Sequence, residues 1–179
     1  CGNCGMEERI LLHHVNHRAL FRRLCTGCVL RLHPQSFCPT CFEVYPPPPP
    51  PSNDAVFTCV KCYSNSHYRC VAGEGRAPPP KPYICAICAA PNSPIFKLEI
   101  SKGEAAANPN KMEEWRVLNA DAAKKLAAAG KIASISMNKA AAAARLEAER
   151  RAREAAYARK RAKDALEHLA NLVKKKKPK

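Results

Sequence analysis

Large apolar side chains are scarce in the first 90 of the 179 residues, and this scarcity limits what can hold that region together. The composition is 46% hydrophobic, but alanine is counted in that share, and alanine buries little apolar area. A small domain with so few large apolar residues does not fold by burial alone. The sequence therefore requires a second source of stability in this region.

Several features of enzymes and membrane proteins are also missing. The seven glycines do not form a phosphate-binding loop, and no nucleophile stands beside a general base in a recognisable motif. No apolar run is long enough to span a bilayer, and we recognise no signal peptide. We therefore expect a protein that is not an enzyme, with no small-molecule substrate and no membrane partner.

Cysteine is abundant instead, with eleven residues that form five Cys-x-x-Cys pairs and one further thiol at Cys70. An odd number leaves one thiol over in any scheme of disulfides. Cys-x-x-Cys pairs in a lysine-rich chain are typical of a reducing compartment, where thiolates bind zinc. We therefore predict that zinc folds this region.

The cysteines of the second half of this region follow an ordered spacing. The pairs, in chain order, are Cys38-x-x-Cys41, Cys59-x-x-Cys62, His67-x-x-Cys70 and Cys85-x-x-Cys88. This order of four cysteines, one histidine and three cysteines resembles a PHD finger over about 51 residues. Tyr83 stands where that family usually has tryptophan. A RING finger normally has its histidine one ligand earlier, so the order favours PHD.

The resemblance implies a cross-brace, in which alternate pairs share one zinc ion. One site would then contain Cys38, Cys41, His67 and Cys70, and the other Cys59, Cys62, Cys85 and Cys88. Each site would be four-coordinate, without an open position for water, as in structural rather than catalytic zinc sites.

Two further pairs lie upstream, Cys1-x-x-Cys4 and Cys25-x-x-Cys28. With the segment LCTGCVLRLH at 24–33 they are similar to a GATA-like four-cysteine finger. Such a finger before a PHD finger is similar to the ADD and extended PHD modules of chromatin proteins. Eleven cysteines and His67 make twelve ligands, which is enough for three zinc ions.

Another assignment of the first ligands stays open at the level of sequence. Cys25, Cys28, Cys38 and Cys41 are close enough to bind one ion together. Cys1 and Cys4 would then take a histidine, with His13, His14 and His17 as the candidates, and His33 is a rival ligand in principle. The apolar residues expected to pack on the first zinc are Leu12, Val15, Leu20, Phe21 and Leu24.

The rest of the chain changes to alanine, lysine, arginine and glutamate, which favour helix. We predict a connector over 91–110 with one short strand at 95–100, then helices over 112–129 and 138–173. Asn110 is the expected first cap and Gly130 the expected stop. The predicted domains are thus 1–33, 34–90, the connector, and a basic helical arm over 111–179. The fold class is a small zinc-bound α+β domain, cross-brace PHD-like with an extra zinc finger, followed by long α-helices.

The second predicted helix combines an apolar stripe with a basic stretch. The stripe has the four–three spacing of a coiled coil and consists of Ala148, Ala152, Ala155, Arg159, Ala162, Leu166, Leu169 and Val173. The basic stretch consists of Arg150, Arg151, Arg153, Arg159, Lys160, Arg161 and Lys163. This stretch fits either DNA phosphates, with salt-sensitive binding, or an acidic protein surface.

Charge is distributed unevenly along the chain, whose formal net charge is +15. Residues 139–179 contain fourteen lysines and arginines against five acids. Eleven thiolates and three Zn²⁺ ions would contribute −5 to the first 90 residues, which carry +4, so the zinc region would be near neutral. The tail resembles a nuclear localisation signal, with Lys174, Lys175, Lys176, Lys177 and Lys179.

These features together predict a nuclear, chromatin-associated scaffold subunit. The finger module would contact a histone tail or another protein, and the arm would dock on a remodelling or histone-modifying complex or on nucleosomal DNA. Two alternatives are a RING-like ubiquitin ligase adaptor and a free-standing histone-tail reader. The reader is less favoured, because only three acids and no tryptophan lie between Cys38 and Cys88.

Overall fold

The structure is a computed structural model that describes residues 1–6, 11–47, 56–73, 81–105 and 108–175. It has a small, β-rich N-terminal region with clustered zinc ligands, followed by a long C-terminal helix. The chain divides into a first unit, Cys1–Met137, and a second unit, Asn138–Lys179. Among the described residues, none of the helices is long and apolar enough to cross a membrane.

The chain begins with a two-stranded hairpin, β1 (Leu12–His17) and β2 (Leu20–Cys25). Arg18 and Ala19 form its turn, both with positive φ, as two-residue hairpin turns require. Val15 and Leu24 are fully buried on one face. The exposed fraction is 38% for Leu12, 55% for Leu20 and 70% for Phe21, so the expectation that these three pack on the first zinc is wrong.

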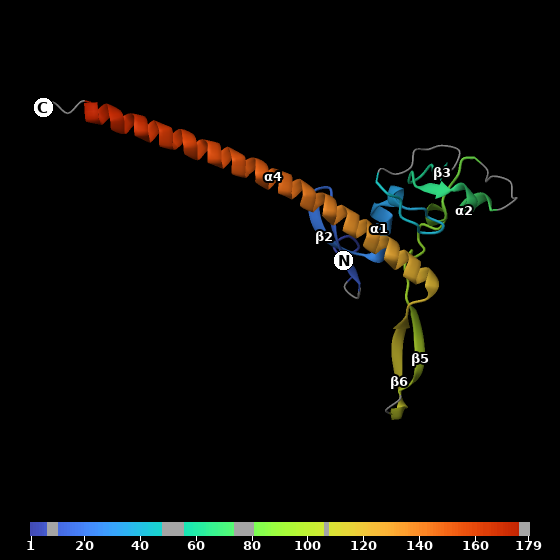
Figure 1. Cartoon of the computed structure of the whole chain (residues 1–179). Helices are drawn as coiled ribbons and strands as arrows, with labels where there is room; N and C mark the ends of the chain where they lie inside the picture. The colour runs from blue at the N-terminus through green and yellow to red at the C-terminus, as the bar shows by residue number, and fades with distance from the viewer. Residues whose placement is uncertain (7–10, 48–55, 74–80, 106–107, 176–179) are drawn as a thin grey trace. The chain divides into compact units, whose positions relative to one another are not determined.

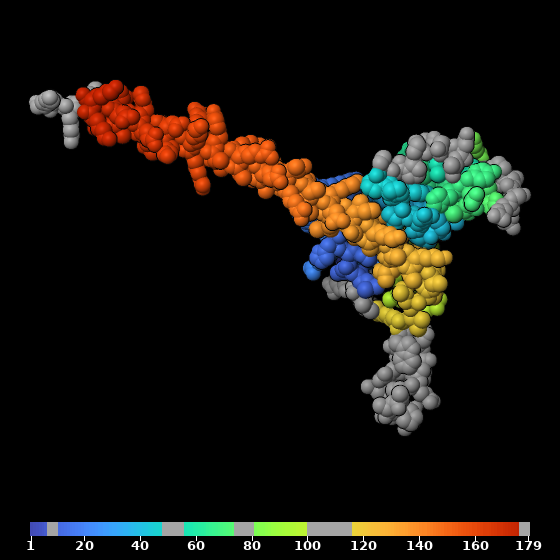
Figure 2. Space-filling model, in the orientation of Figure 1, coloured from blue at the N-terminus to red at the C-terminus, as the bar shows by residue number. Residues whose placement is uncertain are grey.

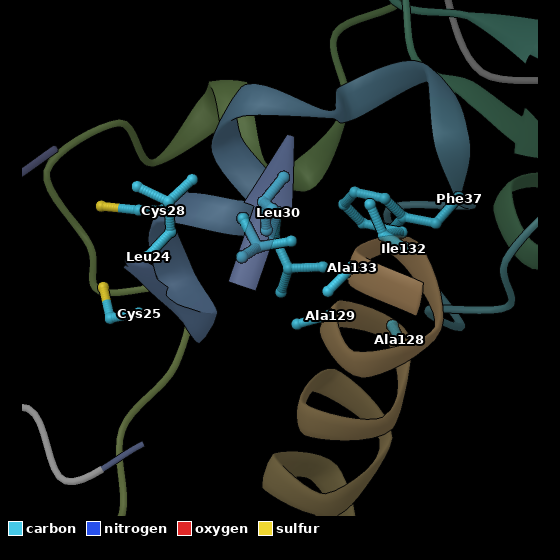
Figure 3. Packing of buried hydrophobic residues seen from close by; sticks show 11 residues of the cluster. Leu24, Cys25, Cys28, Leu30, Phe37, Ala128, Ala129, Ile132 and Ala133 are labelled. Carbon is cyan, nitrogen blue, oxygen red and sulfur yellow. The ribbon is translucent and has the colours of Figure 1, made fainter. Parts of the chain in front are cut away.

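Helix α1 (Thr26–Leu32) and the short 3-10 helix η1 (Pro34–Ser36) follow the hairpin directly. Val29 and Leu30 of α1 and Phe37 after η1 are buried with the hairpin residues in the hydrophobic core. The core is completed from far along the chain by helix α4 (Ala120–Lys175), which contributes Ala128, Ala129, Ile132 and Ala133. Figure 3 shows Ile132 lying beside Phe37 in this cluster.

A reciprocal hydrogen bond fixes α4 to the edge of the hairpin. The Asn16 amide donates to the Ser136 hydroxyl at 3.1 Å, and that hydroxyl donates to the Asn16 carbonyl at 2.7 Å. Both backbone groups belong to β1, and each would otherwise need water as its partner. The first turns of α4 are therefore part of the zinc-binding unit.

The second zinc-binding region contains little regular structure. Strands β3 (Val56–Thr58) and β4 (Asn65–His67) pair antiparallel, and the short helices α2 (Tyr68–Ala72) and α3 (Ala86–Ala89) follow. An isolated bridge joins Phe37 to Val44. Short elements of this kind bury little area, which agrees with the need for metal.

A second hairpin stands where the sequence predicts a connector and the start of a helix. Strands β5 (Glu99–Ala105) and β6 (Asn108–Val117) pair antiparallel, as Figure 1 shows. The predicted strand at 95–100 and helix start at 112 are therefore wrong. The helix-favouring residues 111–116 are strand because pairing with β5, the strand just before them, outweighs local propensity.

The single helix α4 replaces the two predicted helices. Its N-cap is Asn119 and not Asn110, since the Asn119 Oδ1 accepts the Ala122 amide at 2.8 Å. Asn119 also donates to Glu99 Oε1, which joins the cap to the start of β5. Gly130 does not end the helix, because Ala129, Ile132 and Ala133 bury against the first finger and outweigh the cost of about 1 kcal/mol for a helical glycine.

Candidate metal centres

Three clusters of four side chains lie in the first unit, and the ligand atoms of each are within 4.8 Å of one another. They are Cys1, Cys4, Cys25 and Cys28; Cys38, Cys41, His67 and Cys70; and Cys59, Cys62, Cys85 and Cys88. We call them sites 1, 2 and 3. The prediction of three four-ligand sites for three zinc ions is confirmed.

Each site begins with a turn in which the residue after the second cysteine has positive φ. These residues are Gly5 (67°), Phe42 (62°) and Tyr63 (57°). The amide of each donates to the carbonyl of the first cysteine, at 2.9–3.0 Å. The turn closes the Cys-x-x-Cys loop so that both sulfurs point to the same side. Positive φ is strained for aromatic residues, so metal binding must hold Phe42 and Tyr63 in place.

Each site is completed by a pair at the start of a short helix. Cys25, His67 and Cys85 are the residues that precede α1, α2 and α3. The Cys25 amide donates to Cys1 Sγ at 3.2 Å, and the Cys85 amide donates to Cys59 Sγ at 3.4 Å. Sites 1 and 3 therefore share one arrangement, in which a helix start donates a hydrogen bond to the first sulfur of the turn.

Site 1 is the most open of the three, because Cys4 is exposed and Cys1 is half-buried. Its other half is buried beneath α1, where Asn3 Nδ2 donates to Cys28 Sγ at 3.4 Å. Burial, together with the neighbouring thiols, raises the pKa of Cys28 to about 11. Zinc must therefore displace a proton from Cys28, and zinc binding at site 1 is expected to weaken as the pH falls.

Site 2 contains the histidine. His67 Nδ1 lies 3.4 Å from Cys41 Sγ and 3.6 Å from Cys70 Sγ, so this nitrogen faces the sulfurs. Burial raises the pKa of Cys38, but the amides of Cys41, His67 and Thr40 outweigh it and lower that pKa below its usual value. Burial and the charge of Cys38 raise the pKa of Cys70 to about 12.

An aromatic residue that the sequence did not identify supports site 2. The Tyr45 ring lies edge-on to the His67 ring, with 5.2 Å between centroids, and its hydroxyl donates to the Asn65 carbonyl at 2.6 Å. Such contacts around a ligand histidine orient its ring. In the sequence, the only signal for this role is that Tyr45 stands four residues after the ligand Cys41.

Site 3 contains a thiol with a strongly lowered pKa, that of Cys59. Burial raises the pKa of Cys59, but the amides of Cys85, Cys62 and Lys61 lower it to about 6. Burial and the neighbouring thiols raise the pKa of Cys88. One sulfur of this site is thus ready to bind as thiolate at neutral pH, while another gives up its proton to the metal.

The ligands of sites 2 and 3 alternate along the chain, since the pair at Cys59 lies between the two pairs of site 2. Two ions would thus tie segments that are far apart in sequence. Four cysteine or histidine ligands leave no open position, so all three sites suit structural zinc and not a catalytic water.

The alternative assignment, in which Cys25, Cys28, Cys38 and Cys41 bind one ion, is wrong. Cys25 and Cys28 lie with Cys1 and Cys4, and none of the histidines named as rivals is in a cluster of the described residues. His13 Nε2 is 3.1 Å from the Thr26 hydroxyl, and the His17 ring lies edge-on to the His33 ring at 5.3 Å. His13, His17 and His33 thus contact residues outside the three clusters.

The aromatic residues near site 3 pack on one another. The Phe57 centroid lies 5.4 Å from that of Tyr68 and 5.8 Å from that of Tyr83, whose hydroxyl is 2.9 Å from the Ser66 hydroxyl. Stacked rings at 5.4 Å leave no space between them for a methylated ammonium group, which needs a ring face on each side. Phe57 and Tyr83 are half-buried, whereas Tyr68 is 40% exposed, so these rings form a partly exposed stack and not a cage.

All seven residues of the predicted basic stretch lie on α4 within the second unit and are exposed. Of the predicted localisation signal, Lys174 and Lys175 are the last two residues of α4. Lys176, Lys177 and Lys179 lie outside the described residues.

Comparisons with known proteins assign no family to these centres. No protein-family model, no curated protein and no solved structure matches the chain. The chain has three zinc-finger-like clusters of Cys and His ligands and a long C-terminal helix.

Proposed function

We propose that this chain is a non-enzymatic, nuclear, chromatin-associated scaffold subunit. Residues 38–88 are a PHD-like cross-brace finger, and residues 1–33 are a GATA-like finger before it. The finger module contacts a histone tail or another protein, and the helical arm docks on a larger chromatin complex or on nucleosomal DNA. The observation that carries this proposal is the alternation of the ligands of sites 2 and 3 along the chain.

The use of the cysteines supports a structural role for the fingers. All eleven belong to one of the three clusters, so none is left as a nucleophile. Cysteines that are ligands of closed zinc sites stabilise the fold and are not available for catalysis. Such a protein is expected to act through the surfaces with which it binds its partners.

A groove beside site 3 bears on what the finger module contacts. It has a volume of about 260 Å³ and is lined in part by Leu30, Phe37 and Ile87. Its cations are Arg31 and Lys61, and three ligands of site 3 also line it, namely Cys62, Cys85 and Cys88. No carboxylate lines this groove among the described residues. The formal charge of −2 of a zinc ion with four thiolates at site 3 offsets these two cations, so the groove is near neutral and favours an apolar peptide segment over a strongly basic one.

The test is binding to reconstituted nucleosomes, measured by gel shift with the zinc-loaded chain. We expect a complex that forms with the intact chain and weakens when site 3 is opened by Cys59→Ala. Fluorescence polarisation with an unmodified histone-tail peptide then tells whether the finger module binds a histone tail or another protein. If neither nucleosomes nor nuclear chromatin fractions retain the zinc-loaded chain, the proposal is wrong.

A RING-like ubiquitin ligase adaptor is the second candidate, and one surface favours it. Val60 and Ile84 are 50% and 39% exposed beside site 3, and the Val60 amide donates to the Tyr83 carbonyl at 3.0 Å. RING ligases hold a conjugating enzyme on an apolar patch of this kind. Autoubiquitination with a panel of conjugating enzymes, lost in Val60→Asp, would support the adaptor and displace the scaffold.

A further inference from the structure

The basic stretch of the arm consists of two parts that differ in their ion pairs. In the first, residues 147–154, three glutamates and three arginines balance one another. Arg150 donates to Glu147 and Glu154, Arg151 Nε donates to Glu147 Oε1 at 2.7 Å, and Arg153 donates to Glu149 at 3.4 Å. This part, which we call the paired segment, is therefore neutral.

The second part, residues 155–163, contains four cations and no carboxylate. We call it the free segment. Within the described residues of α4, Arg159, Lys160 and Arg161 form no ion pair, and Lys163 lies 3.7 Å from Glu167. The Arg161 guanidinium lies 5.9 Å from the centre of the Tyr157 ring, one turn earlier. All four cations are exposed, and the side chains of the second unit project into solvent in Figure 2 (orange to red).

The cations of the free segment cover more than one face of the helix. Successive residues of an α-helix are about 100° apart, so Arg159, Lys160 and Arg161 spread over about 200° of its circumference. The other residues of the free segment are Tyr157 and four alanines, Ala155, Ala156, Ala158 and Ala162. A flat acidic protein surface can meet only one side of such a helix. A groove with negative charge on both walls can meet all of it.

We propose that the free segment lies in the major groove of duplex DNA, with Arg159, Lys160, Arg161 and Lys163 on the phosphates of both walls. An α-helix with its side chains is about 10–12 Å in diameter, which fits the major-groove width of about 12 Å. Contact with phosphates gives no sequence preference. The proposal rests on the proposed association with chromatin, and it names the DNA-binding residues of the arm.

The paired segment contributes little to this binding. Its arginines already donate to carboxylates, and Arg150 together with Arg151 holds the pKa of Glu147 below its usual value. An arginine that turns to a phosphate there would leave a glutamate unpaired next to the DNA.

The experiment titrates a fluorescent 20-base-pair duplex with the full-length, zinc-loaded chain and follows anisotropy at several salt concentrations. In the test variant Arg159, Lys160 and Arg161 are replaced by Gln. In the control variant the three arginines and three glutamates of the paired segment are replaced by Gln, which also removes three arginines but keeps the net charge. Far-ultraviolet circular dichroism verifies that both variants remain helical.

For the test variant we expect at least about tenfold weaker binding at 0.1 M salt, and a log–log salt slope smaller by roughly 2.7, since each phosphate contact contributes about 0.9. The control variant should bind within about twofold of the unaltered chain. Equal losses in both variants, or no loss in the test variant, would overturn the proposal.

Two further probes separate DNA-groove binding from other anion contacts. Duplex RNA of equal length should bind more weakly, because its major groove is too deep and narrow for a helix. Polyglutamate that binds more tightly than DNA, with the same dependence on Arg159–Arg161, would assign the segment to an acidic protein instead. The assay contains no histone, so its failure leaves the finger contacts of the proposed function in place.

Discussion

The two halves of α4 have similar alanine-rich sequences and opposite surroundings. In the first unit, Ala128, Ala129 and Ile132 are at most 3% exposed in the core of the first finger. In the second unit, Leu146 and Leu166 are each 68% exposed, although leucine buries more area than alanine. Composition therefore does not decide which half is core. Whether a half of α4 is buried depends on which other segments of the chain pack against it.

The two halves of α4 are also stabilised in different ways. The first half closes a zinc module whose own elements are short, through contacts with Phe37 and Asn16. The second half is held by helix propensity and by ion pairs one turn apart, which stabilise a helix by a few tenths of a kcal/mol each. The first half should therefore depend on zinc, and the second should not.

Zinc removal is the largest test of this difference. A chelator should unfold the first unit, because structural zinc contributes about 10 kcal/mol or more per site. The free segment and its neighbours should keep much of their helical circular dichroism, while the near-ultraviolet signal of tyrosines of the first unit such as Tyr45 and Tyr83 is lost. A melting curve unchanged by chelator would contradict this dependence.

Acidification should also unfold the first unit. Because the pKa values of Cys28 and Cys70 are raised, protons compete with zinc for these thiolates as the pH falls.

Replacing one apolar residue in each half is the second test. Ile132→Ala should lower the free energy of unfolding of the first unit by about 2–4 kcal/mol, because it leaves a cavity beside Phe37. Leu166→Ala on the exposed half should change it by less than about 0.5 kcal/mol. Denaturant titration of the zinc-loaded chain measures both values. Similar losses would mean that the second half is packed as well.

Loss of a single hydroxyl gives a smaller effect. Ser136→Ala removes both hydrogen bonds to Asn16 and should cost about 1–2 kcal/mol. The matched control is Ser134→Ala, an exposed serine two residues earlier on the same helix. If the two variants melt at the same temperature, the contact between α4 and β1 does not stabilise the first unit.

Two glycines provide the smallest and most selective test. Neither Gly130 nor Gly5 has an atom within 4 Å of an added Cβ, but Gly5 has a φ of 67° in the turn of site 1. Gly130→Ala should stabilise by about 0.5–1 kcal/mol through helix propensity. Gly5→Ala should destabilise by about 1–2 kcal/mol because of its left-handed backbone. Thermal melts that show the same sign for both would contradict these backbone assignments.

The metal ligands could be predicted because their spacing is a local property of the sequence. Cys59-x-x-Cys62 and the pairs like it indicate turns that present two sulfurs, whatever surrounds them. The pairing of sites 2 and 3 came from the resemblance, and the structure groups the same residues. The PHD-like character itself stays a prediction.

The hairpin β5–β6 and the single helix could not be predicted in the same way. Residues 111–116 favour helix locally, and only their pairing with 99–105 makes them strand. The docking of α4 did leave a signal, because Ala129, Ile132, Ala133 and Ser136 lie three and four residues apart. A stripe in which half the residues are alanine is weak evidence until the surface that covers it is known.

The central claim is that three zinc ions, and not a large core, give the first unit its fold. Native mass spectrometry of the reduced, full-length chain, with elemental analysis of the same sample, tests it directly. The account predicts three zinc ions per molecule and eleven cysteines without disulfides. Two ions or fewer in a folded chain, or cysteines joined to one another, would contradict it.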